Sequence, residues 1–287
     1  AGEIKLRQVY DQTSLLRAFA RYLGSGRAVS DISTIDLQGY RTHLINRGLS
    51  ASRINNHISA FKAMFHWAHE NEVIIALPNL KAIKKLPRTH RPKPTFSPED
   101  IQKLLQEADD VMRAMIWLGL NCGFGCTDCA ELLWENVDLE AARIVFPRTK
   151  TGVNRCLPLW KDTVDALNKL PRTNERVFNT KSGDKLVRVV ERADKTGNAK
   201  MVKCDRVGRR FSEVMSRAGI KRVRGVGFYT LRRTAATLAA RSGDPFAVQQ
   251  LLGHADLKMA TTYVQDVSEQ TDKVVNGVRE LIVPDNS

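Results

Sequence analysis

Near its carboxy end the chain carries three side chains whose types suit chemistry on a phosphodiester. Arg232 is followed by His254 and, nine residues later, by Tyr263. An arginine guanidinium can hold a phosphate through two parallel hydrogen bonds. A histidine can handle a proton, and a tyrosine can attack phosphorus once its hydroxyl is activated. Together these residues predict a reaction on a phosphodiester.

The overall charge agrees with such a substrate. The 287 residues include 45 Lys and Arg against 31 Asp and Glu, a formal net charge of +14. This excess favours a polyanionic partner, with nucleic acid ahead of an anionic membrane surface. No run approaches the roughly 18 consecutive apolar residues that span a bilayer, and the stretch from Ala1 to Lys5 lacks the apolar core of a secretory signal. We expect a cytoplasmic protein that does not bind membranes.

The cysteines allow two interpretations. Their number, five, is odd, which excludes a complete disulfide framework and favours a reducing compartment. Cys122, Cys126 and Cys129 also have the spacing with which radical-SAM enzymes hold an iron–sulfur cluster. The triplet lies in the middle of the chain, however, and cysteine is among the most commonly buried residue types. We favour a packed segment and expect no metal and no cofactor, with the cluster as the alternative.

The first 85 residues have the pattern of a helical domain. Helical segments are predicted from Ser14 to Leu23 and from Ile35 to Arg47, and a long helix begins at Ser50. In the long helix, apolar residues recur at spacings of three and four and predict a stripe that faces the core: Ile54, Ile58, Phe61, Met64, Phe65 and Ala68. Its other faces are polar or basic and form either a solvated surface or a DNA contact: Arg53, Asn55, Asn56, His57, Lys62 and His66.

A change in composition separates this domain from the rest of the chain. Prolines and basic residues alternate in the stretch that follows Lys84, which predicts an extended linker over residues 86–96. Ser97 is then a helix N-cap, with Pro98 in the first helical position. The predicted domains are therefore residues 1–85 and 97–287.

The second domain mixes helices with a small sheet. Helices are predicted over Ile101 to Ala108 and Val111 to Leu120, with the end of a third over Glu131 to Trp134. Two strand-like segments, Arg143 to Phe146 and Asn154 to Leu159, flank a turn and predict a hairpin. Residues 179–207 are polar and basic, fit no element and suggest an insertion. From Phe211 the pattern is helical again, with Asp244 and Pro245 beginning one helix.

Three strings near the carboxy end resemble the signature of the tyrosine recombinase, or phage integrase, family. They are Thr230 to Ala239, Val248 to His254 and Thr261 to Tyr263. The resemblance extends over both domains. It implies an α+β, mainly helical fold: a helical, SAM-like core-binding domain followed by a catalytic domain with a small antiparallel sheet. It also implies a prokaryotic protein of the nucleoid or of a phage.

The resemblance assigns a role to each motif residue. Tyr263 would be the nucleophile that forms a 3′-phosphotyrosine bond and frees a 5′-hydroxyl. Arg232 would bind the non-bridging oxygens, and His254 would hydrogen-bond the phosphate or move the proton. Lys150, in the predicted hairpin turn, would protonate the departing oxygen. The family needs no metal.

The sequence departs from the family pattern at two positions. Gly125 or Cys126 stands where the family has its first catalytic arginine, and Tyr229 stands where a histidine is usual. Losing one charged phosphate ligand costs on the order of 3–4 kcal/mol if nothing replaces it. Tyr229 can still donate a hydrogen bond to a phosphate oxygen. Four basic residues are candidates to replace the arginine, and the sequence does not rank them: Arg113, Arg148, Arg155 and Arg233.

The predicted function is therefore site-specific recombination or integration of DNA. The alternative is a recombinase-fold protein that binds DNA with weak or lost catalysis. The expected partner is double-stranded DNA, contacted by Arg53, Asn56, Lys62, Arg88, Arg91, Lys93 and Arg233. We also expect a tetramer on DNA. The segment from Val267 to Ile282 has an amphipathic pattern, and it either folds back on its own core or docks on a neighbouring subunit.

Overall fold

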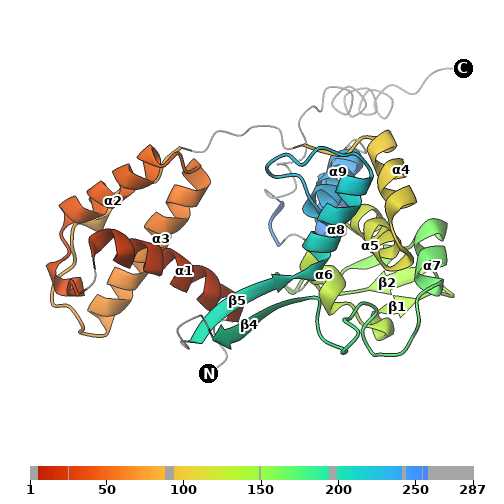
Figure 1. Cartoon of the computed structure of the whole chain (residues 1–287), viewed down its shortest axis with the longest axis horizontal. Coiled ribbons are helices and arrows are strands. Elements are labelled where there is room, and N and C mark those ends of the chain that lie inside the picture. Colours follow the sequence, from red (N-terminus) through yellow and green to blue (C-terminus); the bar gives the residue numbers. More distant parts are fainter. Residues whose placement is uncertain are drawn as a thin grey trace, which may run out of the picture. The chain divides into compact units, whose positions relative to one another are not determined.

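The computed structural model of the chain describes residues 6–24, 26–87, 94–148, 150–193, 199–240, 244–253 and 255–257. The chain divides into two compact units (Figure 1). Unit 1 comprises Ala1–Arg91 with Val189–Val202, and unit 2 comprises Pro92–Arg188 with Lys203–Ser287. Each unit has a hydrophobic core of its own.

Three helices build most of unit 1: α1 (Leu6–Leu23), α2 (Thr34–Asn46) and α3 (Ala51–Glu70). α1 and α2 both pack against α3. The stripe that the spacing of α3 predicts does face the core, although Met64 is only half-buried. α3 begins after Ser50, whose hydroxyl accepts a hydrogen bond from the Arg53 amide and caps the helix as predicted. Short 3₁₀ turns at Val29–Asp31 and Leu80–Ala82 complete the described connections.

Two polar residues of α3 lie inside the unit, where the sequence predicted a solvated or DNA-facing surface. His57 is buried, and its Nδ1 lies 3.0 Å from the hydroxyl of Tyr40. Asn55 is buried as well, and its amide bonds both the N–H and the C=O of Leu86, at 2.8 and 2.9 Å. The prediction was wrong for these two because a polar residue with an internal partner has the same sequence pattern as an exposed one.

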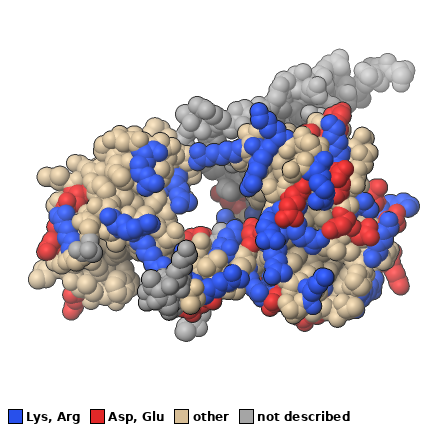
Figure 2. Space-filling view, viewed as in Figure 1, with Lys and Arg blue, Asp and Glu red and all other residues tan. Residues whose placement is uncertain are grey.

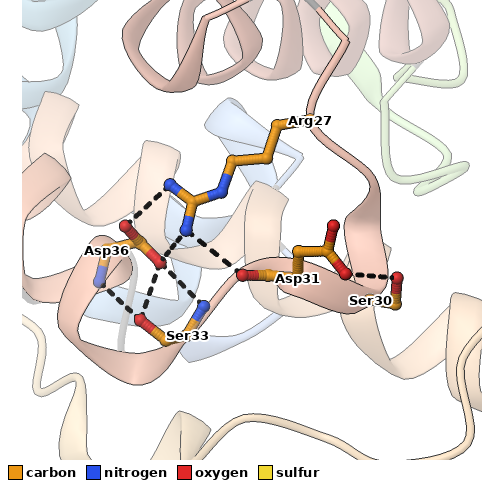
Figure 3. Close-up of polar contacts among 5 residues, drawn as sticks. All are labelled: Arg27, Ser30, Asp31, Ser33 and Asp36. Carbon is orange, nitrogen blue, oxygen red and sulfur yellow. Dashed lines mark hydrogen bonds and ion pairs between the residues drawn. The ribbon is translucent and has the colours of Figure 1, made fainter.

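A network of polar side chains fixes the start of α2 (Figure 3). Ser33 and Asp36 form a reciprocal capping box. The Arg27 guanidinium donates two hydrogen bonds to the Asp36 carboxylate, of 2.9 and 2.8 Å. The hydrogen bonds from Ser33, assisted by Arg27, lower the pKa of Asp36. The loop between α1 and α2 is thereby tied to the first turn of α2.

Unit 2 is mainly helical. Its helices are α4 (Pro98–Glu107), α5 (Asp110–Asn121), α6 (Cys126–Glu131), α7 (Lys161–Asn168), α8 (Arg206–Arg217), α9 (Tyr229–Ala240) and α10 (Pro245–Leu252). The apolar α5 lies at the centre and packs against α7 and α9. Ser97 and Asp244 cap their helices as predicted. The predicted helix end over Glu131 to Trp134 is wrong, because α6 stops at Glu131 and a 3₁₀ turn begins at Trp134.

A three-stranded antiparallel sheet completes unit 2, with strands β1 (Val137–Asp138), β2 (Arg143–Val145) and β3 (Cys156–Pro158) in that order. Ile144 and Leu157 are paired across β2 and β3, and both are buried. The predicted hairpin is confirmed. The unassigned region 179–207 contains a second, two-stranded sheet of β4 (Val187–Ala193) and β5 (Ala199–Asp205). The fold is α+β and mainly helical, as predicted.

Charge is distributed differently over the two units. On the face drawn in Figure 2, basic and acidic side chains are interspersed over unit 2, whereas acidic side chains are confined to a few places on unit 1.

Among the described residues, no helix is long and apolar enough to cross a membrane.

Candidate active site

Arg232 is the centre of the candidate site. It lies on the first turn of α9, only 1% of its surface is exposed, and its guanidinium joins two distant segments. Nη1 donates to the carbonyl of Gly123, after α5, and Nη2 donates to the carbonyl of Leu252, at the end of α10, both at 2.5 Å. The cation is therefore held in one position against the backbone that precedes His254.

Two glycines allow this close packing. Gly123 has φ +61°, and a Cβ there would lie 3.1 Å from the Leu252 side chain. Gly253 caps α10 in the left-handed conformation at φ 58°, and a Cβ there would lie 3.0 Å from Arg155 Cδ and 3.1 Å from Arg148 Cβ. Both positions require glycine for conformation as well as for space. The glycine of the Leu-Gly-His string thus lets two further arginines approach the site.

The β2–β3 turn is tied to the same helix end. Thr151 Oγ1 and Arg148 Nη1 both donate to the carbonyl of Gly253, at 2.9 and 3.2 Å. Lys150, the neighbour of Thr151, lies in this turn with an exposed side chain. The structure thereby brings the turn that carries Lys150 to the residue just before His254. Thr151 had no sequence signal beyond its place next to Lys150.

Tyr229 and Gly125 are neighbours beside Arg232. The Tyr229 ring lies 6.0 Å from the Arg232 guanidinium carbon, and the side chain is half-exposed. A Cβ on Gly125 would lie 3.6 Å from Tyr229 Cδ2, an ordinary van der Waals contact. A side chain at position 125 would therefore contact the Tyr229 ring.

Arg155 is a second buried guanidinium in the site, also 1% exposed. Its Nη2 lies 3.4 Å from Asp128 Oδ1, and its guanidinium carbon lies 4.8 Å from the centre of the Phe124 ring. The other oxygen of Asp128 accepts a 2.8 Å hydrogen bond from the Gly125 amide. Burial lowers the pKa of Arg155, and the like charges of Arg232 and Arg148 act in the same direction against Asp128. An arginine remains cationic under such conditions, so the site concentrates positive charge.

The cysteine triplet lies beside this cluster. Burial raises the pKa of Cys122 and of Cys126 to about 12 and that of Cys129 well above its usual range. Because a metal ligand must be a thiolate, these environments favour protonated, inert thiols. The triplet covers the end of α5 and the start of α6, where it packs with the core.

Some predicted residues lie elsewhere or beyond the described part. His254, Tyr263 and the segment 267–282 are outside the described residues, as are Arg88, Arg91 and Lys93 of the predicted linker. Arg53 and Asn56 are exposed on α3, and Lys62 is half-buried there, with a pKa lowered by burial and by Lys85. Arg233 differs from a DNA-facing side chain. It is 7% exposed, and its guanidinium donates to Gly225 O and to Thr230 Oγ1 inside the unit.

The fold and the site define a class of DNA strand-transfer enzymes. The model of the phage integrase family matches residues 94–270, and that of the phage integrase N-terminal SAM-like domain matches residues 11–72. The chain belongs to the phage integrase family and is a tyrosine-type site-specific recombinase. This membership, rather than an iron–sulfur barrel, accounts for the segment that holds the cysteines.

Relatives and solved structures resemble the chain over nearly its whole length. It is 27% identical to tyrosine recombinase XerD of Rhizobium meliloti (strain 1021), over 92% of this chain and 86% of that protein. It is 26% identical to tyrosine recombinase XerC of Xylella fastidiosa (strain M23), over 84% of this chain and 80% of that protein. In structure it resembles a lambda integrase (75–356) dimer bound to a COC′ core site, with a TM-score of 0.71, 20% identity and coverage of 93% and 92%.

Proposed function

We propose that this chain cuts and rejoins DNA at specific sites through a covalent 3′-phosphotyrosine intermediate. The proposal is supported mainly by two sets of contacts that meet at the end of α10. Arg232 bonds Leu252 there, and the turn with Lys150 bonds Gly253 through Thr151. The residue proposed to bind the phosphate and the turn that carries the proposed proton donor thus both contact the backbone that leads into His254.

The proposed reaction balances without a cofactor. The phenolic oxygen of Tyr263 attacks the scissile phosphorus, so a P–O bond to tyrosine forms while the P–O5′ bond breaks. The phenol proton leaves through His254, and Lys150 gives a proton to the departing 5′-oxygen. A free phenol has a pKa near 10 and attacks poorly, so the cations around Arg232 must stabilise the phenolate and the transition state. The phosphotyrosine ester retains the bond energy, and a 5′-hydroxyl of the second duplex reverses the step to rejoin the strands.

The proposed assembly is a tetramer on two duplexes. A lambda integrase tetramer bound to a Holliday junction has a fold like that of this chain, with a TM-score of 0.70 and 20% identity, and it motivates the assembly. In this assembly, residues 267–282 dock on a neighbouring subunit. Unit 1 contacts double-stranded DNA through Arg53, Asn56 and Lys62. Three basic residues of the linker lie along the DNA phosphate backbone: Arg88, Arg91 and Lys93. Truncation after Asp266 should then weaken assembly on DNA without preventing binding by single subunits.

Trapping the covalent intermediate tests the reaction. A target site is first selected from random DNA by binding at a stated salt concentration, and a nicked suicide substrate is built on that site. The wild type should form a protein–DNA adduct that resists denaturation. Tyr263→Phe should form none, whereas the matched variant Tyr22→Phe, on α1, should form as much as the wild type. An adduct that survives Tyr263→Phe would contradict the proposal.

A second function is favoured by one observation. Gly125 or Cys126 stands at the place of a catalytic arginine, which suits a protein that binds DNA and has lost the chemistry. Tight DNA binding by the wild type without any adduct would support this second function and reject the first.

A further inference from the structure

Gly125 is one of the two residues that can stand at the place of the family arginine, and its backbone does not require glycine. Gly125 has φ −100° and ψ 177°, extended angles that any residue adopts. A Cβ there would lie 3.5 Å from Asp128 Oδ2 and 3.6 Å from Tyr229 Cδ2, which is ordinary contact. This differs from Gly123 and Gly253, where a positive φ and close neighbours require glycine. The chain could therefore hold an arginine at position 125, and its absence calls for a chemical explanation.

Arg155 contacts two residues on either side of Gly125 in the sequence. Its guanidinium lies over the ring of Phe124, which precedes Gly125, with 4.8 Å between the guanidinium carbon and the ring centre. It also pairs with Asp128, whose second oxygen accepts the hydrogen bond from the Gly125 amide. One carboxylate thus connects the backbone of position 125 to the charge of Arg155.

On its other side, Arg155 faces the helix end that precedes His254. Its Cδ lies so close to Gly253 that a Cβ there would be at 3.0 Å. Nη2 bonds Asp128 and Nε bonds the carbonyl of Phe146, whereas Nη1 is buried and has no hydrogen-bond partner within the part of the chain that the structure describes. A buried cationic donor without an acceptor is costly for stability. An anion that binds between the Gly125 segment and the end of α10 would satisfy it.

The other candidates for the missing charge are bonded elsewhere. Arg113, at the start of α5, donates to the carbonyls of Leu105 and Ala108 and pairs with Asp110. Arg233 donates to Gly225 and Thr230 within its own unit. Arg148 bonds the carbonyl of Gly253, at the end of α10. Of these arginines, Arg155 is the one that the described contacts place beside position 125.

We propose that Arg155 replaces the missing catalytic arginine: its Nη1 donates to a non-bridging oxygen of the scissile phosphate, next to Arg232. The proposal rests on the proposed function, because it requires a DNA phosphate to be cleaved beside Arg232. Nη1 is buried in the protein alone, so DNA binding must uncover it. The positive charge that the family supplies from its first arginine then comes from Arg155, the residue that precedes β3.

Single-turnover cleavage of two suicide substrates tests this role. One carries the natural phosphate at the scissile position, and the other carries a methylphosphonate, in which a methyl group replaces one charged non-bridging oxygen. Arg155→Met should cleave the phosphate about 10²- to 10³-fold more slowly than the wild type, the usual loss when a transition-state donor is removed. On the neutral methylphosphonate the two proteins should differ by no more than about threefold, because the charge that Arg155 neutralises is gone.

Two further variants separate a catalytic role from a structural one. Arg113→Met removes the same charge from the same unit and should match the wild type on both substrates. Adding Gly125→Arg to Arg155→Met restores an arginine at the family position and should recover cleavage of the phosphate at least tenfold, on the order of one donor's partial contribution. A purely structural Arg155 would be rescued neither by the second arginine nor by the neutral substrate.

These measurements distinguish an error about Arg155 from an error about the recombinase function itself. If the wild type forms no adduct, the proposed function is wrong. If it forms one and Arg155→Met cleaves as fast as Arg113→Met, or is equally slow on both substrates, the role of Arg155 is wrong. Melting temperature reports whether Arg155→Met folds. If it does not fold, Arg155→Lys decides by the same comparison, since lysine keeps the charge but loses the fork and should be slowed on the phosphate alone.

Discussion

The interiors of the two units bury polar groups of opposite kinds. In unit 1 the buried polar side chains are neutral and satisfied within the unit: His57 lies against the Tyr40 hydroxyl, and Asn55 bonds the backbone of Leu86. In unit 2 the buried groups include the guanidiniums of Arg155 and Arg232. Neutral pairs specify a core at little cost, whereas buried cations are tolerated where an anion will bind. The buried polar groups of unit 1 thus pair with neutral partners, whereas the guanidiniums of Arg232 and Arg155 in unit 2 bond backbone carbonyls and Asp128.

The largest effect should come from the charge that holds the site together. Replacing Arg232 with Met removes the bonds to Gly123 and Leu252 and the proposed phosphate ligand together. We expect single-turnover cleavage to fall by about 10³-fold. DNA binding, measured at one stated salt concentration, should fall far less. Equal losses in binding and cleavage would mean that Arg232 acts only through affinity.

A smaller effect should follow from crowding the end of α10. Gly253→Ala introduces a Cβ at 3.0 Å from Arg155 and 3.1 Å from Arg148, at φ +58°. Gly219→Ala is the matched control, because Gly219 has φ +66° with nothing within 4 Å. Both changes should cost about 1–2 kcal/mol of unfolding free energy for the left-handed backbone. Only Gly253→Ala should slow cleavage, by about tenfold, through displaced arginines. Equal cleavage rates for the two variants would show that Gly253 does not position the arginines for cleavage.

The neutral interior of unit 1 should make the protein sensitive to acid. Burial, assisted by the charges of Arg53 and Arg47, lowers the pKa of His57 below its usual value of 6.5. The unfolded chain therefore binds a proton more readily than the folded one, so the unfolding free energy falls as the pH drops below about 6.5. Denaturant unfolding at pH 7.5 and 5.5 measures this dependence. His57→Gln should reduce it, and His66→Gln, at an exposed position of the same helix, should leave it unchanged.

The smallest effect concerns the exposed surface of unit 1. Each phosphate contact that is lost should reduce the slope of log K against log salt by about one. Arg53→Ala and Lys62→Ala should each do so, because both side chains are proposed to contact DNA. Arg17→Ala removes an exposed arginine from α1 and serves as the control. A slope that falls equally in all three variants would show general electrostatic attraction rather than contacts at α3.

The sequence predicted helices and strands better than it predicted which side chains contact each other in the folded chain. Helix starts at Ser50, Ser97 and Asp244 followed from local capping chemistry, and the hairpin around Lys150 followed from two strand-like segments, because both signals lie within a few neighbouring residues. The burial of His57 did not follow, because it depends on Tyr40, a residue of another helix.

The arrangement of the site shows the same limit. The family pattern indicated Arg232 and Lys150, but it did not indicate their neighbours in space. Thr151 bonds Gly253 across 102 positions, and Arg232 bonds Gly123 across 109 positions and Leu252 across 20. The pairing of Arg155 with Asp128 across 27 positions is likewise a tertiary contact. One local signal was available: Asp128 stands three residues after Gly125, the spacing of a helix cap.

We propose that this chain is an active tyrosine recombinase although Gly125 or Cys126 stands at the place of an arginine. The most direct test is to trap the wild type on its suicide substrate, digest the adduct with trypsin and sequence the DNA-linked peptide by mass spectrometry. We expect a single peptide with the nucleotide attached to Tyr263 through its 3′-phosphate. Attachment at another residue, or DNA bound at saturation without any linked peptide, would contradict it.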